Sequence, residues 1–204
     1  MKNFIIIPAI IAMFASFGAN AQTAEDISSV ENYLNNIKTL SARFVQMASN
    51  GSSAEGEIWI AKPNKIRMVY ADPTDVLIVG NGDYIVYNDK ELDQVTNIDY
   101  DDIPASMLLA NDVKIDGKQI KVKDFHKDTA STSVTLEYAK GNMGPITLTF
   151  SNKPFELKKW SIVDPQNIEV SVSLYNAITD DKIDDSMFKF KHAKDKKSGS
   201  NRKK

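Results

Sequence analysis

Hydrophobic and polar residues alternate through most of the chain beyond residue 38, a period of two that is typical of β-strands with unlike faces. Short alternating runs are separated by Gly, Pro, Asn or Asp, as expected for strands joined by tight turns. The candidate strands are residues 40–49, 56–62, 65–71, 75–80, 83–88, 92–98, 113–115, 119–125, 133–139, 145–150, 155–164 and 168–177, and residues 187–191 could close the sheet edge. This pattern predicts one long antiparallel sheet of roughly eleven strands.

Two segments show helical rather than strand character. Residues 25–38 place apolar side chains three and four positions apart, which predicts an amphipathic helix. Pro104 opens the apolar run 104–110, and proline is favoured in a first helical turn, so about two turns of helix are expected there. A sheet of this width curls, and its apolar concave face must be covered. These two segments are the predicted cover, although the pattern does not distinguish a filled core from a ligand cavity beneath it.

The stretch 56–73 places a cation among apolar side chains. Ile58, Ile60 and Lys62 share one parity before a Pro-Asn turn, and Ile66, Met68 and Tyr70 share one parity after it. Because strand side chains alternate between faces, the Lys62 ammonium is expected at the edge of an apolar surface.

Residues 1–21 have the features of a secretory signal peptide. Lys2 precedes an apolar run that ends near Phe17, and Ala19-Asn20-Ala21 is a small-x-small cleavage motif. A membrane anchor is the alternative, but Pro8 interrupts the run, which is shorter than the ~20 residues of a spanning helix. We therefore expect export, with residues 22–191 forming a single domain.

Composition narrows the possible functions. The chain has no cysteine, which excludes disulfides and thiolate chemistry. The tail 192–204 is rich in Lys and Arg and is predicted to be disordered. The remaining mature chain is acidic, which argues against a nucleic-acid partner.

Only two histidines occur and no catalytic motif is present, so neither an enzyme nor a cofactor is predicted. The acidic clusters at 99–102 and 180–185 have no recognised metal-loop spacing, and no metal site is predicted.

The order of several motifs resembles the LolA family of periplasmic outer-membrane lipoprotein carriers. The resemblance rests on ARFVQ (42–46), WIAKPNKIRMVYADP (59–73), LIVGNGDYIVYNDKELDQVT (77–96) and the Phe-x-Phe of residues 188–190. It covers most of the mature chain and is most specific between residues 40 and 100.

The resemblance implies a mainly β (α+β) fold, a half-open antiparallel β-barrel whose helices cover a hydrophobic cavity on the concave face. It also implies a periplasmic carrier that takes triacylated lipoproteins from an inner-membrane ABC transporter to an outer-membrane lipoprotein receptor. Shielding acyl chains is essential there, because each exposed methylene costs ~0.8 kcal/mol. The predicted ligand-binding residues are Phe44, Ile58, Ile60, Ile66, Met68, Tyr70 and Leu108. The alternative is that these side chains fill an ordinary core.

Lys62 occupies a position that is usually Arg in the family, where the residue holds the covering helices closed. The resemblance therefore implies that Lys62 is a lid latch that donates to helix backbone carbonyls, although a lysine at a strand end can also simply extend its charge to solvent. An ammonium has three donors on a flexible stem and should hold a lid less rigidly than a guanidinium.

Two other functions remain open. A periplasmic regulator that senses lipid or lipoprotein could use the same half-barrel, but such regulators usually carry a second domain, for which this chain is short. A glycolipid carrier is a further variant, but those are usually anchored through a cysteine, which this chain lacks.

Overall fold

A computed structural model describes residues 17–139, 144–164 and 166–190, with side chains from residue 23 onward. One long helix, α1 (Phe17–Asn36), precedes the sheet. The strands are β1 (Thr39–Ala48), β2 (Ser53–Ala61), β3 (Lys65–Tyr70), β4 (Val76–Asn81), β5 (Ile85–Asp89), β6 (Gln94–Ile98), β7 (Ile120–Lys127), β8 (Ser131–Tyr138), β9 (Ile146–Asn152), β10 (Phe155–Val163) and β11 (Glu169–Thr179). Three short 3-10 helices complete the fold: η1 (Tyr100–Asp102), η2 (Pro104–Leu109) and η3 (Asp185–Phe188).

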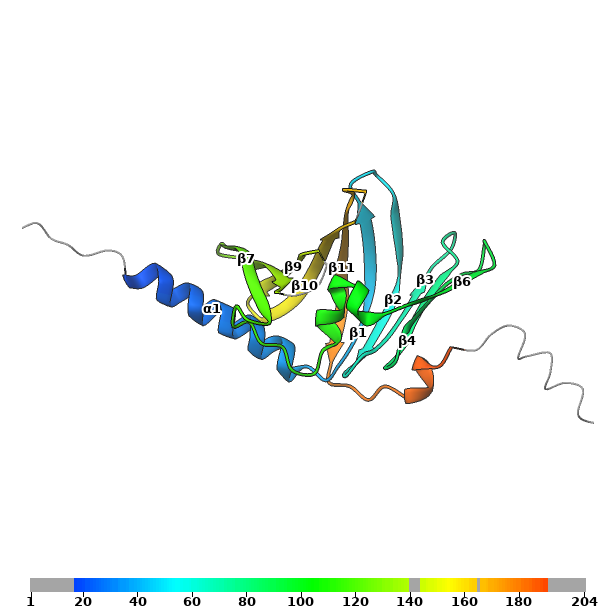
Figure 1. Cartoon of the computed structure of the whole chain (residues 1–204), viewed down its shortest axis with the longest axis horizontal. Helices are drawn as coiled ribbons and strands as arrows, with labels where there is room; N and C mark the ends of the chain where they lie inside the picture. The colour runs from blue at the N-terminus through cyan, green and yellow to red at the C-terminus, as the bar shows by residue number, and fades with distance from the viewer. Residues whose placement is uncertain (1–16, 140–143, 165, 191–204) are drawn as a thin grey trace, which may run out of the picture.

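The strands form one antiparallel sheet in the order β6-β5-β4-β3-β2-β1-β11-β10-β9-β8-β7. Two meanders are joined at the centre, where β1 pairs with β11, and β6 and β7 are left as the edges. Figure 1 shows the sheet curled around η1 and η2, with α1 beside the half that contains β7 to β10. The predicted half-open antiparallel barrel of about eleven strands with covering helices is therefore confirmed.

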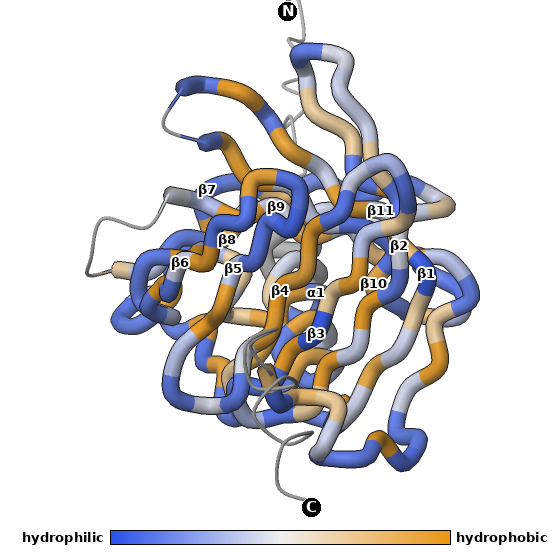
Figure 2. Tube along the Cα trace, turned by 90° about the vertical axis from the view of Figure 1, so that its right-hand side faces the viewer, coloured by the Kyte–Doolittle hydropathy of each residue, from blue (hydrophilic) through white to orange (hydrophobic). Residues whose placement is uncertain are grey.

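Pairing register places the predicted apolar residues on one face. Ile58 lies opposite Met68 and Ile60 lies opposite Ile66, so the alternation continues across the β2–β3 turn (Lys62–Asn64). This face is the concave one, and it is covered by α1 and η2, which together are called the cover below. Figure 2 shows hydrophobic residues concentrated along β3 and β4, with hydrophilic turns at the ends of the strands. The covering side of η2 is apolar, and Met107, Leu108 and Leu109 are all buried.

The strand predicted at 113–115 is not formed. The side-chain amide of Asn35 accepts from the backbone N–H of Val113 at 2.8 Å and donates to its carbonyl at 2.9 Å. The Glu31 carboxylate accepts from the N–H of Ile115 at 2.7 Å. Because side chains of α1 satisfy these backbone groups, the segment lies along the helix instead of joining the sheet.

The edge strand proposed for 187–191 is also wrong for the described residues up to 190. The Asp184 carboxylate accepts from the Ser186 N–H at 2.7 Å and caps η3 as a helix. Arg67 on β3 donates to the Met187 carbonyl at 3.0 Å. Arg67 has the opposite parity to Met68, so η3 covers the convex face and Phe188 is buried there.

Gly56 fixes how closely the strands can pack, and its replacement gives a test of the fold. A Cβ at this position would lie 2.1 Å from the Val69 carbonyl oxygen and 2.9 Å from the Phe44 ring. We expect Gly56→Ala to lower the free energy of unfolding by ~1–3 kcal/mol, as overpacking does. Urea denaturation measures this change. Gly144→Ala is the control, because its nearest neighbour is 3.8 Å away; equal stability of the two variants would contradict the packing described here.

Candidate functional site

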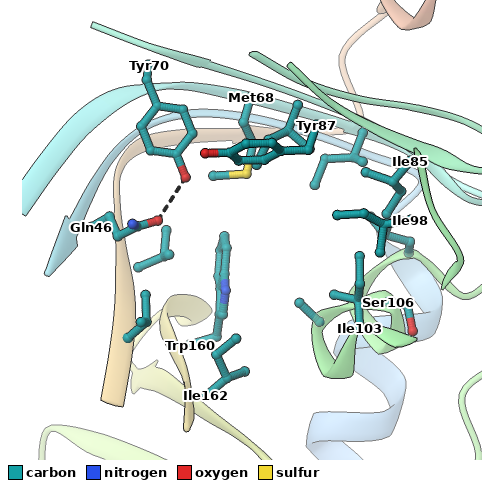
Figure 3. Close-up of a pocket in the computed structure, with 16 residues that line it drawn as sticks. Gln46, Met68, Tyr70, Ile85, Tyr87, Ile98, Ile103, Ser106, Trp160 and Ile162 are labelled. Atoms are coloured by element: carbon teal, nitrogen blue, oxygen red, sulfur yellow. Dashed lines mark hydrogen bonds between the residues drawn. The ribbon is translucent and has the colours of Figure 1, made fainter. Parts of the chain in front are cut away.

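An apolar cavity lies between the two halves of the sheet and η2. Its volume is about 190 Å³. The side chains around it come from β1, β3, β4, β5, β6, β10, β11 and the segment 103–109 (Figure 3). The lining residues are Gln46, Ile66, Met68, Tyr70, Ile78, Ile85, Tyr87, Ile98, Ile103, Ala105, Ser106, Leu109, Trp160, Ile162, Val170 and Val172. None of them is an acid, a lysine or an arginine, so the cavity is suited to an uncharged, apolar ligand.

The polar groups of the cavity are few and neutral. Tyr70 donates from its hydroxyl to Oε1 of Gln46 at 2.8 Å. Burial, with a contribution from nearby Tyr87, raises the pKa of Tyr70 to about 12. Burial also raises the pKa of Tyr87, and the negative charge of Asp89 adds to that effect. Both hydroxyls are therefore protonated at neutral pH.

The structure separates the seven predicted ligand-binding residues into three groups. Ile66, Met68 and Tyr70 line the cavity. Ile60 and Leu108 instead line a second void of about 20 Å³ between α1, η2 and the sheet, where Lys62 also lies. The remaining two, Phe44 and Ile58, are core residues with exposed fractions of 1% and 0%.

Phe44 nevertheless contacts a cavity wall. Its ring lies edge-on to Tyr70, with the centroids 5.0 Å apart and the planes at 76°. This is a favourable aromatic geometry. It fixes the orientation of the Tyr70 ring from the core side.

Sequence reasoning missed most of the cavity. Ile78 lies opposite Met68 and Tyr87 lies opposite Ile78, so extending the parity argument through two further hairpins would have found both. Trp160 and Val172 could not be found in this way. They reach the cavity only because β1 pairs with β11, a contact between segments that are far apart in the sequence.

Three hydrogen bonds join the β2–β3 turn to the segments that lie over the concave face. The Lys62 ammonium donates to the Leu34 carbonyl, near the end of α1. The Asn64 N–H donates to the Leu109 carbonyl at the end of η2, at 3.0 Å. The Asn64 carbonyl accepts from the Tyr100 hydroxyl on η1. This one turn therefore contacts both parts of the cover and the segment that leads into it.

Lys62 has an unusual electrostatic environment. Burial of the ammonium, and secondarily the charge of Lys38, lower its pKa from 10.5 to about 8. Lys38 itself donates to the Asn35 carbonyl at 2.9 Å, so two cations lie at the C-terminal end of α1, where the helix dipole favours positive charge. The Lys62 ammonium is thus held in a closed position that its charge disfavours.

The N-terminal part of α1 has its own attachment to the sheet. Lys127 on β7 donates to Oδ1 of Asp26 at 2.6 Å, and Asp26 is buried. Tyr33, further along the helix, lies edge-on to Phe150 and Phe155. These contacts hold α1 against the half of the sheet that contains β7 to β10.

Comparison with known proteins identifies the family to which the chain belongs. Residues 35–191 match the sequence profile of the family described as "Outer membrane lipoprotein carrier protein LolA". The match covers more than half of the chain, and the chain belongs to the LolA family. Proteins of this family are periplasmic carriers and not enzymes, which confirms the prediction that this chain is not an enzyme.

Individual relatives are distant. An uncharacterized protein of Rickettsia prowazekii is 28% identical over 203 residues, 94% of this chain and 89% of its own. An outer-membrane lipoprotein carrier protein of Erwinia tasmaniensis is 27% identical over 156 residues, 72% of this chain and 74% of its own. A crystal structure of a putative outer membrane lipoprotein-sorting protein domain from Vibrio parahaemolyticus aligns with a TM-score of 0.50 at 10% identity, over 83% of this chain and 97% of that one, and supports the fold.

Among the described residues, no helix is long and apolar enough to cross a membrane. Within the same residues, no three His, Asp or Glu side chains are grouped so that they could hold a metal ion. The predicted signal peptide lies mostly, and the basic tail wholly, outside the described residues, and both stay predictions.

The depressed pKa of Lys62 predicts a specific pH dependence of stability. Between pH about 8 and 10.5 the unfolded chain keeps the Lys62 proton that the folded chain has lost. The folded state therefore gains stability relative to the unfolded state as the pH rises through this window. We expect Lys62→Met to abolish this gain, measured by urea denaturation across the window. Lys182→Met, at an exposed position, is the control; the same slope in wild type and Lys62→Met would contradict the burial of the ammonium.

Proposed function

We propose that this protein is a periplasmic carrier that encloses the acyl chains of lipoproteins. In this proposal it accepts them from an inner-membrane lipoprotein-releasing ABC transporter and passes them to an outer-membrane lipoprotein receptor. The observation that carries the proposal is an uncharged apolar cavity beneath a cover held by a few hydrogen bonds, in a chain of the LolA family. Export through the predicted signal peptide, residues 1–21, is consistent with it.

The size of the cavity supports a cover that opens. A void of ~150 Å³ holds one benzene-sized molecule, and pockets for drug-sized ligands occupy ~300–1,000 Å³. The cavity of about 190 Å³ is therefore too small for three acyl chains. Because the sheet is a continuous hydrogen-bonded ladder, the cover is the part that can move away. The closed structure corresponds to the empty carrier.

The hydrogen bonds of the β2–β3 turn set the cost of opening. A bond from an ammonium to a carbonyl contributes ~1.5–3 kcal/mol. The burial that lowers the pKa of Lys62 opposes this contribution, because the ammonium regains water when α1 moves away. Entry of a few acyl methylenes, each worth ~0.8 kcal/mol, offsets the loss of the bond. Loading and release can then occur without ATP or a metal.

Lysine at this position stabilises the closed state less than an arginine would. A guanidinium has five donors in a rigid fork, whereas Lys62 donates to the single carbonyl of Leu34. In this proposal the Asn64 and Tyr100 bonds supply the remaining attachment of the cover to the β2–β3 turn. Lys62 is a latch that stabilises the closed, empty state and so favours release of cargo.

Replacing Lys62 tests this role. Lys62→Leu removes the bond to Leu34 while keeping an apolar side chain beside the void lined by Ile60 and Leu108. We expect the variant to fold and to accept cargo. It should transfer the cargo about tenfold more slowly, because the closed state is less stable by ~1.4 kcal/mol without this bond. The measurement is transfer of a fluorescent triacylated lipopeptide from the loaded protein to vesicles that contain the outer-membrane receptor.

Two controls make the result decisive. Lys182→Leu removes an exposed cation and should transfer like the wild type. Equal hand-over by wild type and Lys62→Leu would show that Lys62 is only a structural cation. A wild-type protein that binds the lipopeptide and never releases it to receptor vesicles would contradict the carrier function and favour the lipid-sensing regulator instead.

A further inference from the structure

Three polar side chains of the cavity are gathered on one side. Gln46 on β1, Tyr70 on β3 and Tyr87 on β5 all extend into the space from the concave face, and Figure 3 shows their polar ends close together. On the opposite side Figure 3 shows Ile85, Ile98 and Ile103, together with Ser106. The Ser106 hydroxyl is hydrogen-bonded to Tyr138. The cavity therefore has a more polar end at Gln46, Tyr70 and Tyr87 and a more apolar end at the three isoleucines (Figure 3).

Unused hydrogen-bond donors remain at the polar end. The single hydroxyl proton of Tyr70 is donated to Oε1 of Gln46. In the described part of the chain, neither the Gln46 amide nitrogen nor the Tyr87 hydroxyl has a protein partner. No buried side-chain nitrogen or oxygen there lacks a partner, so these two groups keep accessible surface, and both residues line the cavity. Up to three N–H or O–H donors can thus point at a ligand.

We propose that Gln46 and Tyr87, with Tyr70 positioning Gln46, bind the carbonyl oxygens that link acyl chains to the head of the cargo. This inference rests on the proposed carrier function and adds the part of the ligand that is recognised. Ester and amide carbonyls are neutral acceptors and match neutral donors. The hydrocarbon chains then extend toward Ile85, Ile98 and Ile103. Recognition of the linkage fixes the orientation of the cargo, which apolar contacts alone do not.

The hydrogen bond from Tyr70 orients the Gln46 amide. By accepting from Tyr70, Oε1 of Gln46 is held toward that hydroxyl, and the amide nitrogen is left free for the ligand. Tyr70 is in turn oriented by the Phe44 ring. The raised pKa values of Tyr70 and Tyr87 keep both hydroxyls protonated and able to donate. Phe44, one of the residues predicted from the sequence, therefore acts on the ligand only through Tyr70.

The test compares ligands with and without the ester carbonyl groups. The full mature chain is titrated with a triacylated lipopeptide that has two ester links and one amide link, and with a matched analogue in which ethers replace the two esters and the neutral amide is kept. Displacement of an environment-sensitive fluorophore gives Kd. The variants are Gln46→Leu, which is close in size, and Tyr87→Phe, which removes only a hydroxyl. Ile85→Val is the control for a purely apolar change in the cavity.

We expect the wild type to bind the ester-linked lipopeptide about fivefold to tenfold more tightly than its ether-linked analogue, the range for one or two hydrogen bonds. Gln46→Leu and Tyr87→Phe should each reduce this preference without weakening binding of the analogue. Ile85→Val should weaken both ligands equally. If Gln46 had only a structural role, Gln46→Leu would weaken the binding of both ligands equally, and that result would overturn the assignment.

The remaining outcomes separate this inference from the proposed function. Binding of both lipopeptides with no preference would overturn only the carbonyl recognition. Binding of neither would overturn the carrier function itself. A long-chain free fatty acid, which also offers a carbonyl oxygen, is the third ligand. Loss of fatty-acid binding in Gln46→Leu, with lipopeptide binding unchanged, would overturn the assignment to the ester and amide links of a lipoprotein.

Discussion

The β2–β3 turn is the point at which the sheet holds its cover. An eleven-stranded sheet that curls into a half-barrel has a broad apolar face, and in the described part of the chain α1, η2 and the segments that flank η2 lie over it (Figure 1). Lys62 bonds to the end of α1, and Asn64 bonds to the end of η2. Both bonds come from one turn, so moving that turn or its partners changes access to the whole concave face.

Side chains of α1 tie the segment that follows η2 to the helix: Asn35 and Glu31 hold the backbone at 113–115. The apolar cavity lies between η2 and the strands that carry Met68 and Trp160. A small space that can be enlarged suits a carrier better than a large open one, because the empty protein exposes little apolar surface to water.

Local patterning predicted much of this structure, and long-range pairing explains what it missed. Alternation and tight turns predicted the strands from β1 to β6 closely. Parity placed Lys62 on the side of Ile60, and both side chains line the void beneath α1. The same local rules failed at 113–115, where side chains of α1 replace a neighbouring strand as hydrogen-bond partners. They also could not predict that Trp160 and Val172 lie near Gln46. The β1–β11 pairing that brings these residues together leaves no periodic signal in the sequence.

A spin-label distance measurement tests whether the cover opens when cargo binds. The chain has no cysteine, so Asn111→Cys, just after η2, and Glu57→Cys, on the exposed convex side of β2, can be labelled uniquely. Pulsed electron paramagnetic resonance then gives the distance between the labels with and without triacylated lipopeptide. We expect the loaded protein to show a longer distance than the empty one. An unchanged distance with lipopeptide demonstrably bound would contradict an opening cover.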